Sequence, residues 1–164
     1  MVLIAMNVTA QKKMSFDLAA IRSMHSDLNG LNVSSFYHFN EKLIGGIEVN
    51  RFFPVNKNIK KETVQVSAWD IDCNFHYLLP LHDHLKFYPL TGFSHTSEKE
   101  FIPDLNESSY EHFWSFNTGA GMVWELHKWS PHIEYNCTWG HIDQQFLLVG
   151  ISYEIAWGHT SEKK

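Results

Sequence analysis

Large residues alternate with small or polar ones along residues 147–157. One set of alternate positions is large and apolar or aromatic (Leu147, Val149, Ile151, Tyr153, Ile155 and Trp157), and the other is smaller and partly polar (Leu148, Gly150, Ser152, Glu154 and Ala156). Side chains at every second position of a strand share one face, so this pattern predicts a β-strand between two different environments. Residues 69–77 and 132–139 repeat the pattern, and we therefore expect an all-β chain.

Eight segments with this period are expected along the chain. They are residues 14–24, 31–39, 43–53, 64–77, 85–96, 114–126, 130–140 and 144–157. All are longer than the ~5–6 residues common in soluble sheets. A tilted strand needs roughly 9–11 residues to cross a bilayer, so the lengths favour strands that span a membrane.

The connections between these segments alternate in length. Short turns are expected at residues 40–42, 79–84 and 127–129, and longer polar loops at residues 25–30, 55–62 and 97–112. Only the short connection at residues 141–143 departs from the alternation. Short turns at one end and long loops at the other are typical of an up-and-down membrane barrel. With a periplasmic N-terminus, the long loops would lie outside the cell.

The apolar faces are expected to point outward into lipid. Glycines within the segments, such as Gly92 and Gly121, suit the crowded interior of a narrow barrel. Aromatic residues near the segment ends, such as Phe53, Trp124 and Trp157, suit girdles at the membrane interfaces. The alternative is a secreted soluble barrel, similar to a lipocalin, in which the bulky faces would line a cavity for an apolar ligand.

Two further classes of protein are excluded. No apolar run reaches the ~20 residues that a membrane-spanning helix needs. With 13 Lys and Arg against 18 Asp and Glu, the net charge of −5 gives no electrostatic basis for binding nucleic acid.

Four stretches carry a resemblance to a known family. They are Leu85–Phe93, Asn117–Trp124, Ile133–Asn136 and Phe146–Ile155. In these stretches the chain resembles the small eight-stranded outer-membrane β-barrels, the porin-family or OmpA/OmpX-type barrel domains. The resemblance implies a closed, up-and-down, antiparallel, eight-stranded transmembrane β-barrel in the bacterial outer membrane. It also implies insertion by the barrel-assembly machinery, with outer-membrane lipid and lipopolysaccharide as partners, and we expect a monomer.

The expected domain organisation is a single barrel with two short flanking segments. Residues 1–10 are interpreted as the remnant of a signal peptide, because an apolar stretch is followed by Val8-Thr9-Ala10. Residues 11–158 form the barrel, and residues 159–164 form a short polar tail. The family usually ends in an aromatic residue that assists insertion, whereas here Trp157 is followed by seven more residues, 158–164.

The polar faces are expected to line the barrel interior. The candidate lumenal residues are Glu48, Asn50, Asp70, Asp72, Asn74, His76, Glu125, His132, Glu134, Asn136 and Glu154, with Lys86 as the best candidate cation. Eight strands leave room only for side chains, so we favour a packed, hydrogen-bonded interior over an ion path. The histidines, including His25, His38, His82, His84 and His141, lack the spacing of metal ligands. We expect no metal or other cofactor.

One pair of residues suggests catalysis. His95 and Ser97 are two residues apart on one expected strand, so they share a face on which the imidazole could activate the hydroxyl. The pair resembles the His-x-Ser sequence of outer-membrane lipid A deacylases, although Glu98 stands where that family has Asn. A non-enzymatic protein is preferred, and the deacylase is retained as a second alternative.

The expected function is envelope integrity, adhesion or contact with a surface ligand through the long loops. Lys57, Lys60 and Lys61 form a basic loop that could meet lipopolysaccharide phosphates. Cys73 and Cys137 fall on strands that are not neighbours in a closed eight-stranded barrel, so no disulfide is predicted between them.

Overall fold

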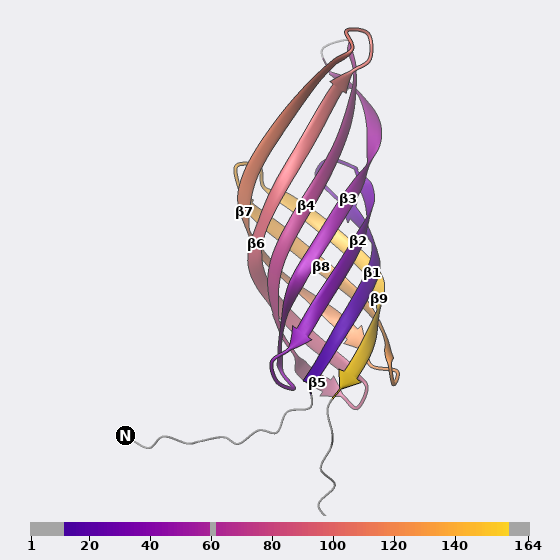
Figure 1. Ribbon diagram of the computed structural model, residues 1–164, viewed down its shortest axis with the longest axis vertical. Helices are drawn as coiled ribbons and strands as arrows, with labels where there is room; N and C mark the ends of the chain where they lie inside the picture. The colour runs from indigo at the N-terminus through magenta and orange to yellow at the C-terminus, as the bar shows by residue number, and fades with distance from the viewer. Residues whose placement is uncertain (1–11, 60–61, 158–164) are drawn as a thin grey trace, which may run out of the picture.

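The structure is a computed structural model that describes residues 12–59 and 62–157 (Figure 1). Within these residues nine strands form one antiparallel sheet. They are β1 (Lys12–Ser23), β2 (Asn29–His38), β3 (Leu43–Ile59), β4 (Glu62–Tyr77), β5 (Leu79–His82), β6 (Leu85–Ile102), β7 (Glu107–Trp124), β8 (Trp129–Gly140) and β9 (Gln144–Trp157). The described residues contain no helix long and apolar enough to cross a membrane. The predicted signal-peptide remnant and polar tail lie outside the described residues.

The sheet closes on itself into a barrel of eight strands. Neighbours follow the order β4-β3-β2-β1-β9-β8-β7-β6, and β4 also pairs with β6, so every strand of the ring has a neighbour on both sides. The pairing between β4 and β6 runs from Gln65 opposite Phe101 to His76 opposite Leu90. The four-residue β5 only extends the turn that leads into β6. The closed, up-and-down, eight-stranded barrel predicted from the alternation is therefore confirmed.

The two faces of the wall differ as the sequence predicts. On β4, the outward Ile71 is 54% exposed, whereas its inward neighbours Asp70 and Asp72 are 3% and 5% exposed. Large exposed apolar and aromatic residues surround the whole barrel in this way. Such a surface is stable only against lipid. The soluble lipocalin-like alternative is therefore wrong, because the bulky faces lie on the exterior rather than around a cavity.

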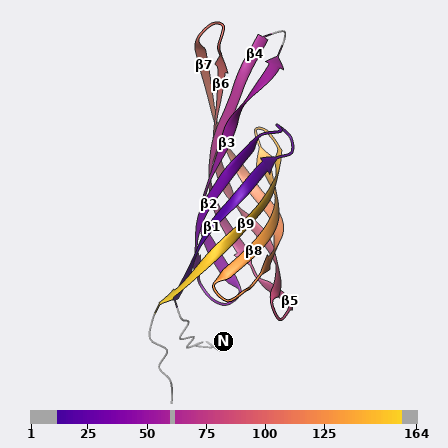
Figure 2. The same ribbon diagram turned by 90° about the vertical axis from the view of Figure 1, so that its right-hand side faces the viewer.

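Two hairpins are longer than predicted. Residues 55–62 and 97–112 were expected to be loops, but β3 continues to Ile59, β4 starts at Glu62, β6 continues to Ile102 and β7 starts at Glu107. The prediction was wrong on β6 because Ser97 and Lys99 alternate there with Glu98 and Glu100, so both faces are polar, and on β3 because the short alternation of residues 55–59 is interrupted by Lys57. The hairpins rise beyond the turns that join β1 to β2 and β8 to β9 (Figure 2).

The extended hairpins form a separate part of the sheet, which we call the upper sheet. It comprises residues 53–59 of β3, 62–68 of β4, 97–102 of β6 and 107–114 of β7. The pairing between β2 and β3 ends at Phe52, and the pairing between β7 and β8 ends at Ser115. Beyond these residues β3 and β7 are the edge strands of a four-stranded sheet. We call this the upper end of the barrel, and the end where β1 begins and β9 ends the lower end (Figure 1).

The two cysteines are free. Cys73 lies on β4 and Cys137 on β8, and these strands are not neighbours in the sheet. The predicted absence of a disulfide between them agrees with this arrangement.

Candidate functional site

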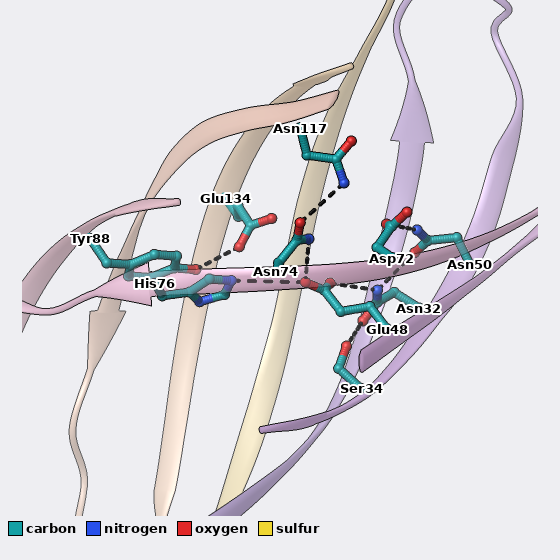
Figure 3. Close-up of polar contacts among 10 residues, drawn as sticks. All are labelled: Asn32, Ser34, Glu48, Asn50, Asp72, Asn74, His76, Tyr88, Asn117 and Glu134. Atoms are coloured by element: carbon teal, nitrogen blue, oxygen red, sulfur yellow. Dashed lines mark hydrogen bonds and ion pairs between the residues drawn. The ribbon is translucent and has the colours of Figure 1, made fainter. Parts of the chain in front are cut away.

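A network of buried amides and carboxylates fills the middle of the barrel (Figure 3). Its centre is Glu48 on β3, which is 4% exposed. Asn32 Nδ2 donates to Glu48 Oε2 at 3.1 Å, and Asn74 Nδ2 donates to Glu48 Oε1 at 2.7 Å. Asn117 Nδ2 on β7 donates to Asn74 Oδ1 at 3.1 Å, which carries the network across the barrel.

A second branch of the network joins β2, β3 and β4. Asn32 Nδ2 also donates to Asn50 Oδ1 at 2.7 Å, and Asn50 Nδ2 donates to Asp72 Oδ2 at 2.8 Å. An asparagine amide both donates and accepts hydrogen bonds, whereas an ionised carboxylate only accepts them. A row of asparagines can therefore link acidic groups that cannot hydrogen-bond to one another. This explains why asparagine recurs at inward positions on several strands.

Close packing in this layer depends on Gly92. A side chain at Gly92 would overlap the Asn74 amide and the backbone of Cys73. The glycine therefore makes room for the buried amide, as expected of glycines in a narrow barrel.

Below the amide layer, ionisable groups surround a cavity of about 60 Å³. Tyr88 Oη donates to Glu134 Oε2 at 3.0 Å. The ring of His76 stacks on Tyr88 with centroids 4.8 Å apart, and its Nε2 lies 3.8 Å from Glu48 Oε1. The second oxygen of Glu134 and the His76 Nε2 have no hydrogen-bond partner in the described part of the chain.

The opposite wall of this cavity holds a second acid and imidazole. Asp17 Oδ1 accepts a hydrogen bond from Ser152 at 3.0 Å and lies 3.4 Å from His132 Nδ1. Across residues 12–59 and 62–157, no group of three or more His, Cys, Asp or Glu side chains is arranged to hold a metal ion.

Apolar clusters lie above and below this polar interior. The upper cluster consists of Ala19, Ile21, Leu28, Phe52, Val64, Val66, Ala68, Phe146 and Leu148. At its centre the rings of Phe52 and Phe146 are stacked with centroids 5.5 Å apart. The lower cluster consists of Phe36, Ile44, Leu78, Tyr88 and Leu90.

Ion pairs stand at the lower mouth of the barrel. Lys13 Nζ lies 2.9 Å from Glu154 Oε1, and Lys86 Nζ lies 2.7 Å from Glu125 Oε1. Lys86, the predicted lumenal cation, thus pairs with Glu125 rather than with the acids around the cavity.

Most predicted lumenal residues are buried together. Glu48, Asn50, Asp70, Asp72, Asn74, His76, Glu134 and Asn136 are all buried, and His132 is half-buried. Glu125 and Glu154 lie instead at the lower mouth. Sequence reasoning missed Asp17, Asn32, Tyr88 and Asn117, although each stands at an inward position of the same alternation.

His95 and Ser97 both lie on the outward side of β6. The His95 ring packs edge-on against Trp114 with centroids 4.8 Å apart, and lies 6.0 Å from the His112 ring. The hydrogen bonds and ion pairs of the described residues join His95 neither to Ser97 nor to a carboxylate. The contacts needed to activate the serine are therefore not assembled.

Lys57, of the predicted basic loop, is opposite Val64 in the register. Opposite residues of an antiparallel pair share a face, and Val64 is buried in the upper cluster, so Lys57 lies on the inner face of the upper sheet. Glu98, which is opposite the buried Ala68, shares that inner face. Burial and the charge of Glu100 raise the pKa of Glu98, and the charge of Lys57 partly offsets this effect. Lys60 and Lys61 lie outside the described residues.

The comparisons with known proteins rest on structure. No protein-family model and no curated protein matches the sequence. The chain is similar to the N-terminal β-barrel domain of Pseudomonas aeruginosa OprF, with a TM-score of 0.65 and 14% identity over 88% of this chain and 98% of that one. It is similar to Yersinia pestis Ail, the attachment invasion locus protein, crystallised with the heparin analogue sucrose octasulfate, with a TM-score of 0.63 and 14% identity over 89% and 99% of the two chains.

A third similar structure is Neisserial surface protein A, with a TM-score of 0.61 and 10% identity over 89% of this chain and 96% of that one. At such low identities the likeness concerns the fold. The chain has the fold of the small eight-stranded outer-membrane β-barrels.

Proposed function

We propose that this chain is a non-enzymatic protein of the bacterial outer membrane that holds the upper sheet outside the cell as a contact surface for an extended segment of another protein. The observation that carries the proposal is the free edge of β7. From Glu107 to Trp114 this strand pairs with β6 on one side and, within the described residues, with no strand on the other. Unpaired backbone groups on a sheet edge readily accept another strand.

The surroundings of the β7 edge favour a ligand. A hollow of about 400 Å³ lies beside it, lined by Glu111, His112, Phe113, Trp114 and His141. The other edge, on β3, carries Pro54 next to a bulge between Phe52 and Val55. Proline and bulges block edge pairing, so the two edges are not equivalent and β7 is the open one.

The interior supports a role at the surface rather than in transport. The amide network lies between two apolar clusters, and the cavity of about 60 Å³ has room for only a few water molecules. We therefore propose that the lumen is packed and does not conduct ions. Ail, which has a similar fold, is by its name an attachment and invasion protein, and this likeness agrees with a role in adhesion.

The test removes one edge at a time. Replacing Glu98–Glu111 by Asn-Gly joins the paired residues Ser97 and His112 through a two-residue hairpin turn and removes Glu107–Glu111, which is most of the β7 edge. The matched control replaces Asn56–Gln65 by Asn-Gly, which joins Val55 to Val66 and keeps β7. A phage-displayed peptide library is panned against the detergent-solubilised wild-type barrel, and the enriched peptides are then measured on both variants.

We expect the enriched peptides to bind the β3–β4 control and to lose binding to the variant with the shortened β7 edge. Retained mobility shifts on boiling in SDS would show that each variant still forms a closed barrel. Equal binding to both shortened variants, or no enrichment on the wild-type barrel, would rule out the β7 edge as the contact surface.

A further inference from the structure

A straight row of four side chains crosses the outer face of the barrel wall at the base of the upper sheet. Arg51 on β3 is opposite Trp69 on β4, Trp69 is opposite Ser97 on β6, and Ser97 is opposite His112 on β7. Opposite residues share a face, and Trp69 is 48% exposed on the outside. The whole row therefore points outward.

Cationic and aromatic groups alternate in and around this row. The Arg51 guanidinium lies over the Trp69 ring, 4.7 Å from its centroid. One pair further up, Lys99 is opposite Tyr110, and its Nζ is 5.6 Å from the Tyr110 ring centroid.

One pair further down, His95 is opposite Trp114, and their rings pack with centroids 4.8 Å apart. We call these eight residues the rim patch: Arg51, Trp69, His95, Ser97, Lys99, Tyr110, His112 and Trp114.

Acidic residues of the same strands lie on the other face. Glu98 is opposite Ala68 and Glu100 is opposite Val66, and both partners are buried in the upper apolar cluster. Glu111 is opposite Glu98 and so shares that inner face. On β6 and β7, alternation thus places these acids inside and Lys99 outside, whereas Lys57 of β3 lies on the inner face with the acids.

The two permanent cations of the rim patch lack acidic partners. The ion pairs found among residues 12–59 and 62–157 include neither Arg51 nor Lys99. The patch therefore presents uncompensated positive charge on an outward surface.

The rim patch lies where the outer surface changes from apolar to polar. Next to it on the barrel side, Ile71 is opposite His95, and Phe93 and Phe116 continue the exposed apolar wall. On the other side, outward positions of the upper sheet carry polar pairs such as Asn56 with Gln65. In a membrane barrel this boundary is the level of the lipid headgroups.

We propose that the rim patch binds the phosphate of a phosphorylated lipid in the outer leaflet. This inference rests on the proposed function, because it requires the upper end of the barrel to face outward. A guanidinium matches a phosphate through paired, charge-assisted hydrogen bonds. Trp114 of the same patch is 71% exposed. A lipid would cover this ring at the headgroup boundary, whereas a small soluble anion would leave it in water.

The experiment compares lipid retention by the purified full chain. The barrel is reconstituted in phosphatidylcholine vesicles with or without added bis-phosphorylated lipid A, extracted into detergent, and its bound lipid is counted by native mass spectrometry. The test variant is R51Q/K99Q, measured together with both single variants. The matched control is R22Q, because Arg22 is an exposed arginine on β1, two strands from Arg51, whose charge is already paired with Asp27 at 3.1 Å.

We expect the wild type and R22Q to retain lipid A, and R51Q/K99Q to retain it about tenfold less because two charge-assisted contacts are lost. Inorganic phosphate should not displace the lipid. Equal retention by the double variant, an equal loss in R22Q, or full displacement by inorganic phosphate would each overturn the lipid site.

Failure of the lipid site can be distinguished from failure of the proposed function. A mobility shift on boiling in phosphatidylcholine vesicles reports the membrane barrel alone, and peptide binding reports the β7 edge alone. A barrel that inserts and binds peptide but retains no lipid A would overturn only the rim patch.

Discussion

Tyr88 on β6 and Glu134 on β8 form a buried hydrogen bond across the inner face of β7, the strand that lies between them. Both are opposite Gly121 of β7, one on each side. A side chain at Gly121 would overlap the Tyr88 ring. The missing side chain of Gly121 thus lets two residues from non-adjacent strands meet, with 3.0 Å between Tyr88 Oη and Glu134 Oε2.

Replacing Gly121 by valine should destabilise the barrel by ~1–3 kcal/mol, because overpacking would displace the Tyr88 ring. The free energy of unfolding in urea, measured in lipid vesicles, gives this difference. The control is A120V, because Ala120 is the next residue on β7 and faces outward. Equal stabilities of G121V and A120V would contradict the role of Gly121.

Replacing Tyr88 by phenylalanine should lower the free energy of unfolding by ~1–3 kcal/mol, since Glu134 would lose its only hydrogen-bond donor among the described residues. The double variant Y88F/E134L removes both polar groups and should recover part of that loss. If Y88F is as stable as the wild type in urea, the hydrogen bond contributes nothing to stability.

The upper sheet should open less readily at acid pH. Burial raises the pKa of Glu98 above its ordinary value of 4.5, so the folded sheet binds a proton more tightly than the open one. Protonated Glu98 therefore contributes stability below pH 4.5, and this contribution disappears as the pH rises through the raised pKa.

Hydrogen exchange of the β6 and β7 amides, corrected for intrinsic rates, measures this effect. Protection should fall as the pH rises in the wild type and change less in E98Q. The same pH profile for both proteins would assign the dependence to another group.

The lumen should conduct no ions until its upper apolar cluster is removed. The stacked rings of Phe52 and Phe146 fill the space above the amide network. In planar bilayers, we expect no current steps from the wild type and measurable steps from F52A/F146A. The variant V149A, which changes an outward residue of β9, is the control. Current through the wild type would contradict a packed interior.

The wall of the barrel could be predicted because each of its faces meets a distinct environment. On residues 69–77, lipid outside and a polar interior impose an alternation that distinguishes the inward acids from the outward apolar residues in the sequence alone. Most of the upper sheet apart from residues 64–68 escaped prediction, because neither of its faces meets lipid along its length. There Glu98 and Lys99 alternate by sign of charge rather than by polarity, which resembles a loop in sequence.

The hydrogen-bond partners in the barrel interior could not be predicted from the sequence, for another reason. The period places Asn74 and Asn117 at inward positions, but their hydrogen bond depends on which residues face each other once β4 meets β6. That register is set where β4 pairs with β6 and β6 pairs with β7. Alternation along one strand carries no information about it, so the partners of each buried amide appear only in the folded barrel.

Closure by the first and last strands also has a consequence for assembly. β1 pairs with β9 from Lys12 opposite Trp157 to Ser23 opposite Phe146. Until β9 pairs with it, β1 is an unpaired edge of twelve residues. An intermediate without this pairing is an open sheet with one apolar face and one polar face. We expect such an intermediate to need a temporary partner along the β1 edge until β9 pairs there.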